Sequence, residues 1–224
     1  MIGIGNVIFQ ILAIVILAGF YSIYIGKMIL QKRSGIQTDQ MAKGKKSKEL
    51  FVTEIILKFA TYSIVLVEII SIYKNTTLAF MPLRITGVIF GTVGVVLFGM
   101  AVHTMKDSWR AGIPESDKTD LVTTGVFSIS RNPAFLAFDL IYLGILFMFF
   151  NWALFICTIL SMTMLHLQIK QEEKFLIGTF SSEYQKYKQQ TRRYIGRKAS
   201  RCTQAGESAV NNEIKCRQIT IYLT

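Results

Sequence analysis

The sequence predicts an all-α integral membrane protein with about five transmembrane helices, of which the last two form a helical hairpin followed by a cytoplasmic amphipathic helix. Three observations carry this prediction. The 224-residue chain is 51% hydrophobic and only 17% charged, whereas soluble domains carry roughly 25% charged residues. Several apolar stretches approach the roughly 20 residues that a helix needs to cross a bilayer. Basic residues gather in alternate connections between these stretches, as the positive-inside rule requires.

Residues 1–104 are expected to hold three helices and a basic cytoplasmic connection. The first helix is predicted over Gly5 to Ile29, and no charged residue precedes Lys27. Because no basic leader precedes the apolar run, we read it as a retained helix and not as a signal peptide. The third helix, Ile85 to Val102, is rich in glycine. Small residues at helical spacing favour close packing between helices in lipid.

The second helix, Phe51 to Tyr73, is interrupted by charged residues. Glu54 and Lys58 are four residues apart, a spacing that lets them pair on one helix face. Together with Glu68 they are the only sequence hint of polar groups at mid-membrane depth, which a transporter would need.

The hairpin is predicted from a long uncharged run, Leu140 to Ile169. One straight helix of about 30 residues would be about 45 Å long, more than a hydrocarbon core of about 30 Å accommodates without steep tilt. A turn at Asn151 and Trp152 divides the run into two helices, Ala134 to Phe150 and Trp152 to Gln168, and returns the chain to the face that it left. Both helices are only marginally long enough to span.

After the hairpin, Glu172 to Tyr194 has apolar residues at spacings near three and four, which is typical of an interfacial amphipathic helix. These residues are Phe175, Leu176, Phe180, Tyr184 and Tyr187. We therefore expect a core unit over residues 105–196. Residues 197–224 show no periodicity and are predicted to be a disordered basic tail.

The net charge of +11 indicates membrane topology and not nucleic-acid binding, because the basic residues lie in alternate connections. The amino terminus is expected outside and the carboxyl-terminal tail inside the cell. Cys157, Cys202 and Cys216 lack metal-ligand spacing, so we expect free thiols and no metal. We also expect no obligate protein partner.

Two polar clusters flank the hairpin. Arg131-Asn132-Pro133 precedes it; proline suits the first turn of a helix, and an arginine there can hold a carboxylate or phosphate. Glu172 and Glu173 follow it, and adjacent helical residues point about 100° apart, so that one can face a pocket while the other meets solvent or an arginine. Taken singly, these signals also fit a snorkelling arginine and an ordinary solvated helix segment.

Taken together, the motifs follow a characteristic order. LVTTGxF at 121–127 and SRNPxFL at 130–136 precede the hairpin, and EExxL at 172–176, FxxEYxxY at 180–187 and Arg193 follow it. This order resembles the integral-membrane methyltransferases of the isoprenylcysteine carboxyl methyltransferase and phospholipid methyltransferase family, in its bacterial type. The resemblance covers about residues 107–196.

The resemblance implies S-adenosylmethionine as cofactor, bound at the cytoplasmic face of a multi-pass protein in the bacterial plasma membrane. The residues that it assigns to the cofactor pocket are Leu121, Gly125, Arg131, Asn132, Phe135, Glu172 and Glu173, with Tyr184 and Tyr187 packing the terminal helix over it. Asn132 replaces a frequent histidine and Phe135 a frequent tyrosine. The arginines that many relatives carry just before the glutamate pair are absent from residues 166–171. These departures leave the methyl acceptor open.

The acceptor is expected to be a membrane lipid or a lipidated small molecule. A carboxylate acceptor needs only a cation such as Arg131, whereas an amine must lose a proton, with which Glu172, Glu173 or His166 can assist. We therefore name Arg131, Glu173 and His166 as catalytic candidates. Asp139 is expected to pair with Lys106, Arg110 or Arg131, in preference to contacting the substrate. Trp109, Arg110 and the connection to Asp120 are expected to form a lid.

Two other functions remain open at this point. Membrane reductases with a nicotinamide cofactor share a similar carboxyl-terminal arrangement, although the glutamate pair and the terminal helix pattern argue against them. A non-catalytic scaffold or transporter is favoured only by the charged residues of the second helix.

Overall fold

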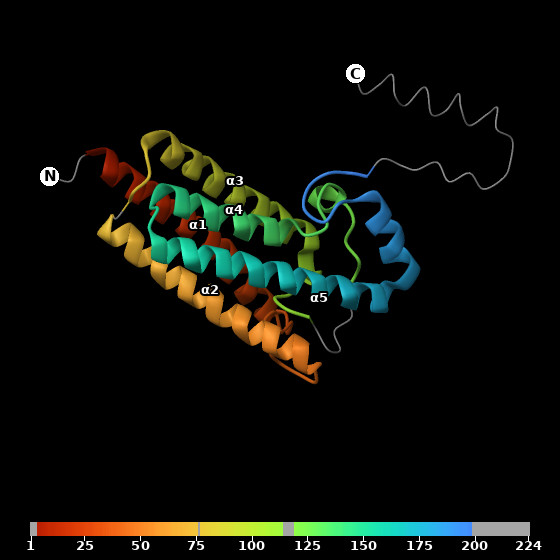
Figure 1. The fold of residues 1–224 in the computed structure, drawn as a ribbon. Helices are drawn as coiled ribbons and strands as arrows, with labels where there is room; N and C mark the ends of the chain where they lie inside the picture. The colour runs from red at the N-terminus through yellow and green to blue at the C-terminus, as the bar shows by residue number, and fades with distance from the viewer. Residues whose placement is uncertain (1–3, 76, 114–118, 199–224) are drawn as a thin grey trace, which may run out of the picture.

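The computed structural model describes residues 4–75, 77–113 and 119–198, and within these ranges its regular structure is helical (Figure 1). The α-helices are α1 (Ile4–Arg33), α2 (Lys48–Lys74), α3 (Met81–Met105), α4 (Pro133–Met148) and α5 (Trp152–Gln190), and two 3-10 turns, η1 (Lys106–Ser108) and η2 (Gly125–Ser128), lie between α3 and α4. In the described ranges, strand pairing is limited to two isolated bridges. The predicted all-α integral membrane fold is confirmed.

Four of the five predicted spans are helices of membrane-crossing length. α1, α2, α3 and α5 are long and apolar enough to cross a membrane. α4 has only 16 residues, or about 24 Å at 1.5 Å per residue, which falls short of a hydrocarbon core of about 30 Å. The fourth predicted span is therefore a short helix that packs against longer neighbours.

The carboxyl-terminal boundary of the hairpin was predicted wrongly. The structure has no break between Gln168 and Glu172: α5 continues for 39 residues to Gln190 and departs from helical geometry only at Ser181, with φ 41° and ψ −110°. The charged stretch after Ile169 consists of Lys, Gln and Glu, which are good helix formers, so nothing in it stops the helix. The amphipathic segment is thus the far end of the last apolar helix.

Glycines set the closest helix contact. A Cβ atom on Gly87 of α3 would lie 2.6 Å from the carbonyl oxygen of Gly144 on α4, and one on Gly94 would lie 2.7 Å from Cγ1 of Ile141. The backbones of α3 and α4 therefore approach as closely as small residues allow, as predicted.

The predicted turn at Asn151 is also present. The Asn151 side chain caps α5 by accepting a hydrogen bond from Leu154 N at 3.0 Å, and its Nδ2 donates to Ser71 Oγ of α2 at 2.9 Å. The turn lies at the end of the bundle where the described chain begins, so α4 starts at the opposite end and α5 returns to it. There, residues 34–47, 106–113, 119–132 and 170–198 gather; we call this the polar end (Figure 1).

Candidate functional site

The two predicted polar clusters meet at the polar end. Glu173 accepts a hydrogen bond from Nη2 of Arg131 at 2.6 Å, and from Nε and Nη2 of Arg193 at 3.0 and 2.8 Å. We call these three residues the clamp. The side chains of Arg131 and Glu173 are only 4% and 5% exposed. The clamp joins the start of α4, the middle of α5 and the segment that follows α5.

Arg131 also makes hydrogen bonds to groups other than Glu173. Its Nη1 donates to the backbone carbonyl oxygens of Lys188 and Thr191, both at 3.2 Å, and its backbone N–H donates to Arg192 O at 3.1 Å. The guanidinium therefore fixes the chain after α5 against the start of α4. On the other side of Glu173, the hydrogen bonds from Arg193 raise the pKa of that arginine.

Asn132 also links the start of α4 to the segment that follows α5. Its Nδ2 donates to Arg193 O at 3.2 Å, and its backbone N–H donates to Ser130 Oγ at 3.1 Å. Pro133 begins α4, as the sequence predicted. The Arg131-Asn132-Pro133 motif thus starts a helix and anchors the segment 191–196 at the same time.

Leu121 and Gly125 lie in a separate apolar cluster. Leu121 packs with Phe127 and the buried rings of Tyr184 and Tyr187, and the Tyr187 hydroxyl donates to Phe127 O at 2.6 Å. Gly125 has φ +58°, and a Cβ there would lie 3.1 Å from Cγ2 of Thr104. Tyr184 and Tyr187 therefore pack the end of α5 onto the 121–130 segment and do not line the cavity described next.

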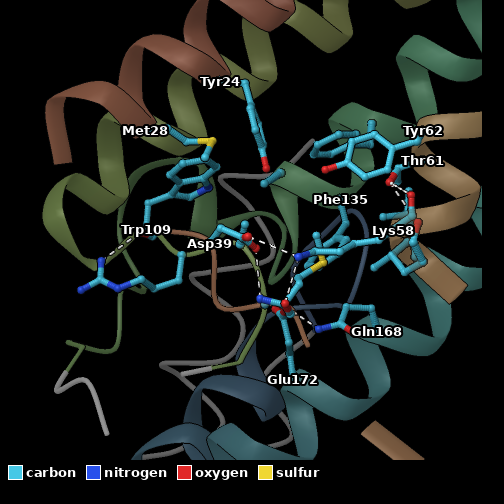
Figure 2. A pocket seen from close by; sticks show the side chains of 18 of the residues that line it. Tyr24, Met28, Asp39, Lys58, Thr61, Tyr62, Trp109, Phe135, Gln168 and Glu172 are labelled. Atoms are coloured by element: carbon cyan, nitrogen blue, oxygen red, sulfur yellow. Dashed lines mark hydrogen bonds and ion pairs between the residues drawn. The ribbon is translucent and has the colours of Figure 1, made fainter. Parts of the chain in front are cut away.

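A cavity of about 270 Å³ lies between α1, α2, α4 and α5, and the segments 39–41 and 109–112 contribute to its wall (Figure 2). We call it the interhelical cavity. Its wall includes the aromatic residues Tyr21, Tyr24, Tyr62, Trp109, Phe135, Phe138 and Tyr142. Polar side chains concentrate toward one part of it, where Asp39, Lys58, Gln168 and Glu172 lie together in Figure 2.

The glutamate pair is divided between the cavity and the clamp. Glu172 lines the cavity, with Gln168 one turn before it, whereas Glu173 points into the clamp. Gln168 Nε2 donates to Glu172 Oε1 at 3.3 Å, and Gln168 Oε1 is buried without a hydrogen-bond donor. Phe135 reaches the same cavity from α4. The prediction that one glutamate faces a pocket and the other an arginine is confirmed.

Asp39 and Lys58 form the second polar pair of the cavity wall. Lys58 Nζ lies 3.2 Å from Asp39 Oδ2 and 3.0 Å from Met41 O, and Lys43 Nζ lies 3.1 Å from the same carboxylate. Partial burial acts to raise the pKa of Asp39, but its ionic hydrogen bonds to both lysines outweigh this effect and hold the pKa below its usual range. The Asp39 carboxylate is thus shared between the ammonium groups of Lys58 and Lys43.

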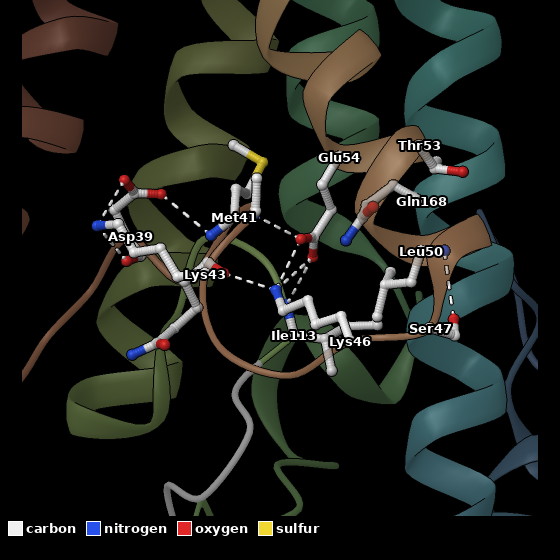
Figure 3. Close-up of polar contacts among 12 residues, drawn as sticks. Asp39, Met41, Lys43, Lys46, Ser47, Leu50, Thr53, Glu54, Ile113 and Gln168 are labelled. Carbon is white, nitrogen blue, oxygen red and sulfur yellow. Dashed lines mark hydrogen bonds and ion pairs between the residues drawn. The ribbon is translucent and has the colours of Figure 1, made fainter.

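A cluster of polar contacts joins the start of α2 to two connecting segments at the polar end (Figure 3). Lys46 Nζ lies 2.7 Å from Glu54 Oε2, and both side chains are almost completely buried. Glu54 also accepts hydrogen bonds from Ala42 N at 2.6 Å and Ile113 N at 3.3 Å. The segments 34–47 and 107–113 are thereby held together; we call them the cover.

The contacts of the cover differ from two predictions made from the sequence. Glu54 pairs with Lys46 and not with Lys58, because the connection between α1 and α2 brings a closer ammonium group to it. Trp109 and Arg110 do line the cavity, as a lid would, but the segment 34–47 is the other half of that lid. Part of the predicted lid, residues 114–118, lies outside the described residues.

His166 and Asp139 differ from their predicted settings. His166 Nδ1 lies within hydrogen-bond distance of the Tyr194 hydroxyl, the two rings stack with centroids 6.0 Å apart, and His166 is not part of the cavity wall. Asp139 forms no ion pair with Lys106, Arg110 or Arg131 in the described ranges, and its Oδ1 is buried without a donor.

Metal chemistry was not expected, and no group of three or more metal-ligating side chains is found among the described residues. Cys157 is a free thiol in the same ranges. Cys202 and Cys216, together with the predicted disordered tail from 199 onward, lie outside the described residues.

Residues 83–178 match the isoprenylcysteine carboxyl methyltransferase (ICMT) family. The match confirms the resemblance to this family over these residues but does not distinguish a bacterial type, and it supports a membrane methyltransferase in general. A comparison with curated proteins finds no match.

The ICMT match covers one side of the site. It runs from α3 through α4 into α5 and includes both the Arg131-Asn132-Pro133 motif and the glutamate pair. α1, α2 and the 34–47 half of the cover lie before it, and Arg193 lies after it. The residues that sequence reasoning missed come from these outer parts: Asp39 and Lys58 reach the cavity only because α1 and α2 fold against α4 and α5.

Proposed function

We propose that the protein is an S-adenosylmethionine-dependent methyltransferase that acts on a lipid or lipidated small molecule at the cytoplasmic face of the membrane. The observation that carries this proposal is the division of the glutamate pair, which leaves Glu172 in the cavity wall while Glu173 is held by Arg131 and Arg193. The basic connections at the polar end favour the cytoplasmic side. The resemblance adds the bacterial plasma membrane as the expected location.

The cavity wall suits a cationic cofactor. S-adenosylmethionine carries a sulfonium and an ammonium group, and both are favoured beside a carboxylate and an aromatic face. Glu172 supplies the carboxylate, Phe135 the aromatic ring, and Gln168 a buried oxygen that lacks a donor. When bound, the cofactor would supply an electrophilic methyl group.

The chain's own contribution to transfer is alignment. Methyl transfer is an in-line displacement, so most of its acceleration comes from holding the reacting atoms in position. In this proposal Arg131, Asn132 and Glu173 are positioning residues that fix the start of α4 to α5, and thereby fix Phe135 opposite Glu172. Leu121 and Gly125 shape the segment that packs beneath the end of α5. His166 holds the segment after α5 through Tyr194.

Calorimetry on the purified protein in an uncharged detergent tests this proposal. We expect binding of S-adenosylmethionine at micromolar concentration, weakened about tenfold by Glu172→Gln. Glu183→Gln, at an exposed glutamate of the same helix, is the matched control and should bind normally. Binding of a nicotinamide cofactor instead, or of neither cofactor, contradicts the proposal.

A further inference from the structure

A second hollow lies on the side of α1 that faces away from the interhelical cavity. It is a groove of about 470 Å³ between α1 and α3, close to the point where both helices reach the polar end; we call it the α1–α3 groove. Tyr24 and Met28 of α1 face the interhelical cavity, whereas Ile23, Gly26 and Lys27 line the groove. Among the described residues, none lines both spaces. The function proposed above therefore leaves this groove without a role.

The charged and titratable side chains of the groove are all basic. Lys27 comes from α1, and His103 and Lys106 come from the end of α3. Neither helix contains an Asp or a Glu. Lys27 Nζ lies 3.7 Å from Asp107 Oδ1, but the Asp107 side chain is 79% exposed, and such a surface ion pair is weak. The groove therefore has an excess of positive charge.

Two of these three basic residues have no partner in the protein. Within the described ranges, the side chains of His103 and Lys106 make no ion pair and no hydrogen bond. Lys106 also has φ 46° and ψ −124°, a backbone conformation that favours glycine, so a lysine is held there at a conformational cost. The carboxyl end of α3 carries a partial negative charge. An anion in the groove must therefore be attracted by the side chains and not by the helix end.

The part of the groove away from the polar end is apolar and open. Ile23 precedes Lys27 by about one helical turn and Gly99 precedes Lys106 by about two, so this part lies deeper in the membrane than the basic side chains. A Cβ on Gly26 would meet no atom within 4 Å, and one on Gly99 would lie 3.5 Å from Cδ1 of Ile23. These glycines leave space, in contrast to the close glycine contacts between α3 and α4. A basic rim above an open apolar channel is complementary to a phospholipid with a negative charge.

We propose that the α1–α3 groove binds an anionic phospholipid from the membrane leaflet at the polar end. Lys27, His103 and Lys106 hold its phosphate, and one acyl chain lies along Gly26 and Gly99 between the two helices. Basic pockets between transmembrane helices recognise anionic lipid headgroups in this manner. The lipid is a bound ligand and not a methyl acceptor, because the groove is separate from the interhelical cavity. The inference does not depend on the methyl-transfer proposal.

Lipid binding joins the ends of the two helices that lead into the cover. The 34–47 half of the cover follows α1, and the 107–113 half follows α3. Gln31 Nε2 already links them by donating to Trp109 O at 3.1 Å. A phosphate in contact with both Lys27 and Lys106 adds a second link between the same helix ends. A ligand that binds only the folded state raises its stability, so we expect anionic lipid to raise the thermal unfolding midpoint.

Native mass spectrometry of the protein in an uncharged detergent tests the inference. Dioleoylphosphatidylglycerol and dioleoylphosphatidylcholine have the same chains and differ in net charge, and we expect the first to bind at least about tenfold more tightly. Lys27→Gln with Lys106→Gln should weaken its binding about thirtyfold. Lys32→Gln with Lys186→Gln removes the same charge from exposed positions outside the groove and should change the affinity less than about twofold. Equal affinity for the two lipids, or equal weakening by the two pairs of changes, overturns the inference.

Two further variants separate loss of the site from loss of the fold. Gly26→Leu fills the apolar part of the groove, and leucine is a better helix former than glycine. The unfolding midpoint without lipid should therefore not fall, whereas phosphatidylglycerol affinity should drop about tenfold. Lys27→Arg with Lys106→Arg keeps both charges and should retain lipid binding. Unchanged lipid affinity in Gly26→Leu contradicts the proposed position of the acyl chain.

A soluble competitor distinguishes a lipid from a free phosphate. Glycerol 1-phosphate carries the same phosphate chemistry without acyl chains. At a concentration equal to that of phosphatidylglycerol, we expect it to leave the lipid bound, because it lacks the apolar contacts of the groove. If it displaces the lipid, the groove is a site for soluble anions and the inference is wrong.

Discussion

Glu172 and Glu173 are neighbours in the sequence, yet they occupy opposite environments. Glu173 lies within 3.0 Å of two guanidinium groups, whereas Glu172 has no ion pair in the described ranges and faces the interhelical cavity with Gln168. The rotation of about 100° between adjacent helical residues is enough to separate them. The same residue type is thus available for support on one face of α5 and for ligand binding on the other.

Breaking the clamp should produce the largest loss of stability. Glu173→Gln leaves the buried Arg131 guanidinium without its carboxylate, and removal of one partner from a buried ion pair costs about 3 kcal/mol or more. We expect a clearly lower thermal unfolding midpoint in uncharged detergent. The double change Arg131→Met with Glu173→Leu should lose less than either single change. If Glu173→Gln has the same thermal unfolding midpoint as the parent protein, the clamp does not stabilise the fold.

Substitution of Glu172, on the face of α5 toward the cavity, should weaken cofactor binding and leave the stability of the fold unchanged. Glu172→Gln removes a carboxylate that has no ion pair, so we expect an unfolding midpoint no lower than that of the parent. Cofactor affinity should nevertheless fall about tenfold, or about 1.4 kcal/mol. A loss of stability comparable with that of Glu173→Gln would erase the distinction between the two faces.

Tyr187→Phe tests whether the end of α5 only supports the site. The change removes a buried hydrogen bond to Phe127 O, which should cost about 1 kcal/mol of stability. Cofactor affinity, measured by calorimetry at a temperature where both proteins are folded, should stay within about twofold. A larger drop in affinity than in stability would assign Tyr187 to ligand binding.

The smallest expected effect is a pH dependence of the cover. Because the folded-state pKa of Asp39 is lowered, its stabilisation is complete above the unfolded value of about 3.9 and is lost as the pH falls through the lower, folded value. For a partly exposed pair the loss should stay below about 1 kcal/mol. Asp39→Asn should remove this component from unfolding midpoints measured between pH 6 and pH 3, whereas a parent-like acid profile would contradict it.

The sequence predicted the helices better than their polar contacts. The turn at Asn151, the proline start of α4 and the glycine contact with α3 follow from local rules of capping, proline geometry and residue size. The proposed pairs of Glu54 with Lys58 and of Asp139 with nearby cations did not form. Spacing along a helix shows which residues share a face, but it does not show whether a loop brings a closer partner.

The sequence by itself determined that the chain is an all-α integral membrane protein, that two polar motifs flank a hairpin, and that these motifs resemble a family of membrane methyltransferases. Apolar length, proline position and motif order are properties of consecutive residues, so they can be read without coordinates. Only the tertiary structure decided which glutamate faces the cavity, which arginines are occupied, and that Asp39 and Lys58 reach the same wall. Those outcomes depend on which side chains from distant segments lie closest to each carboxylate. The spacing of residues along the chain does not give these distances between side chains.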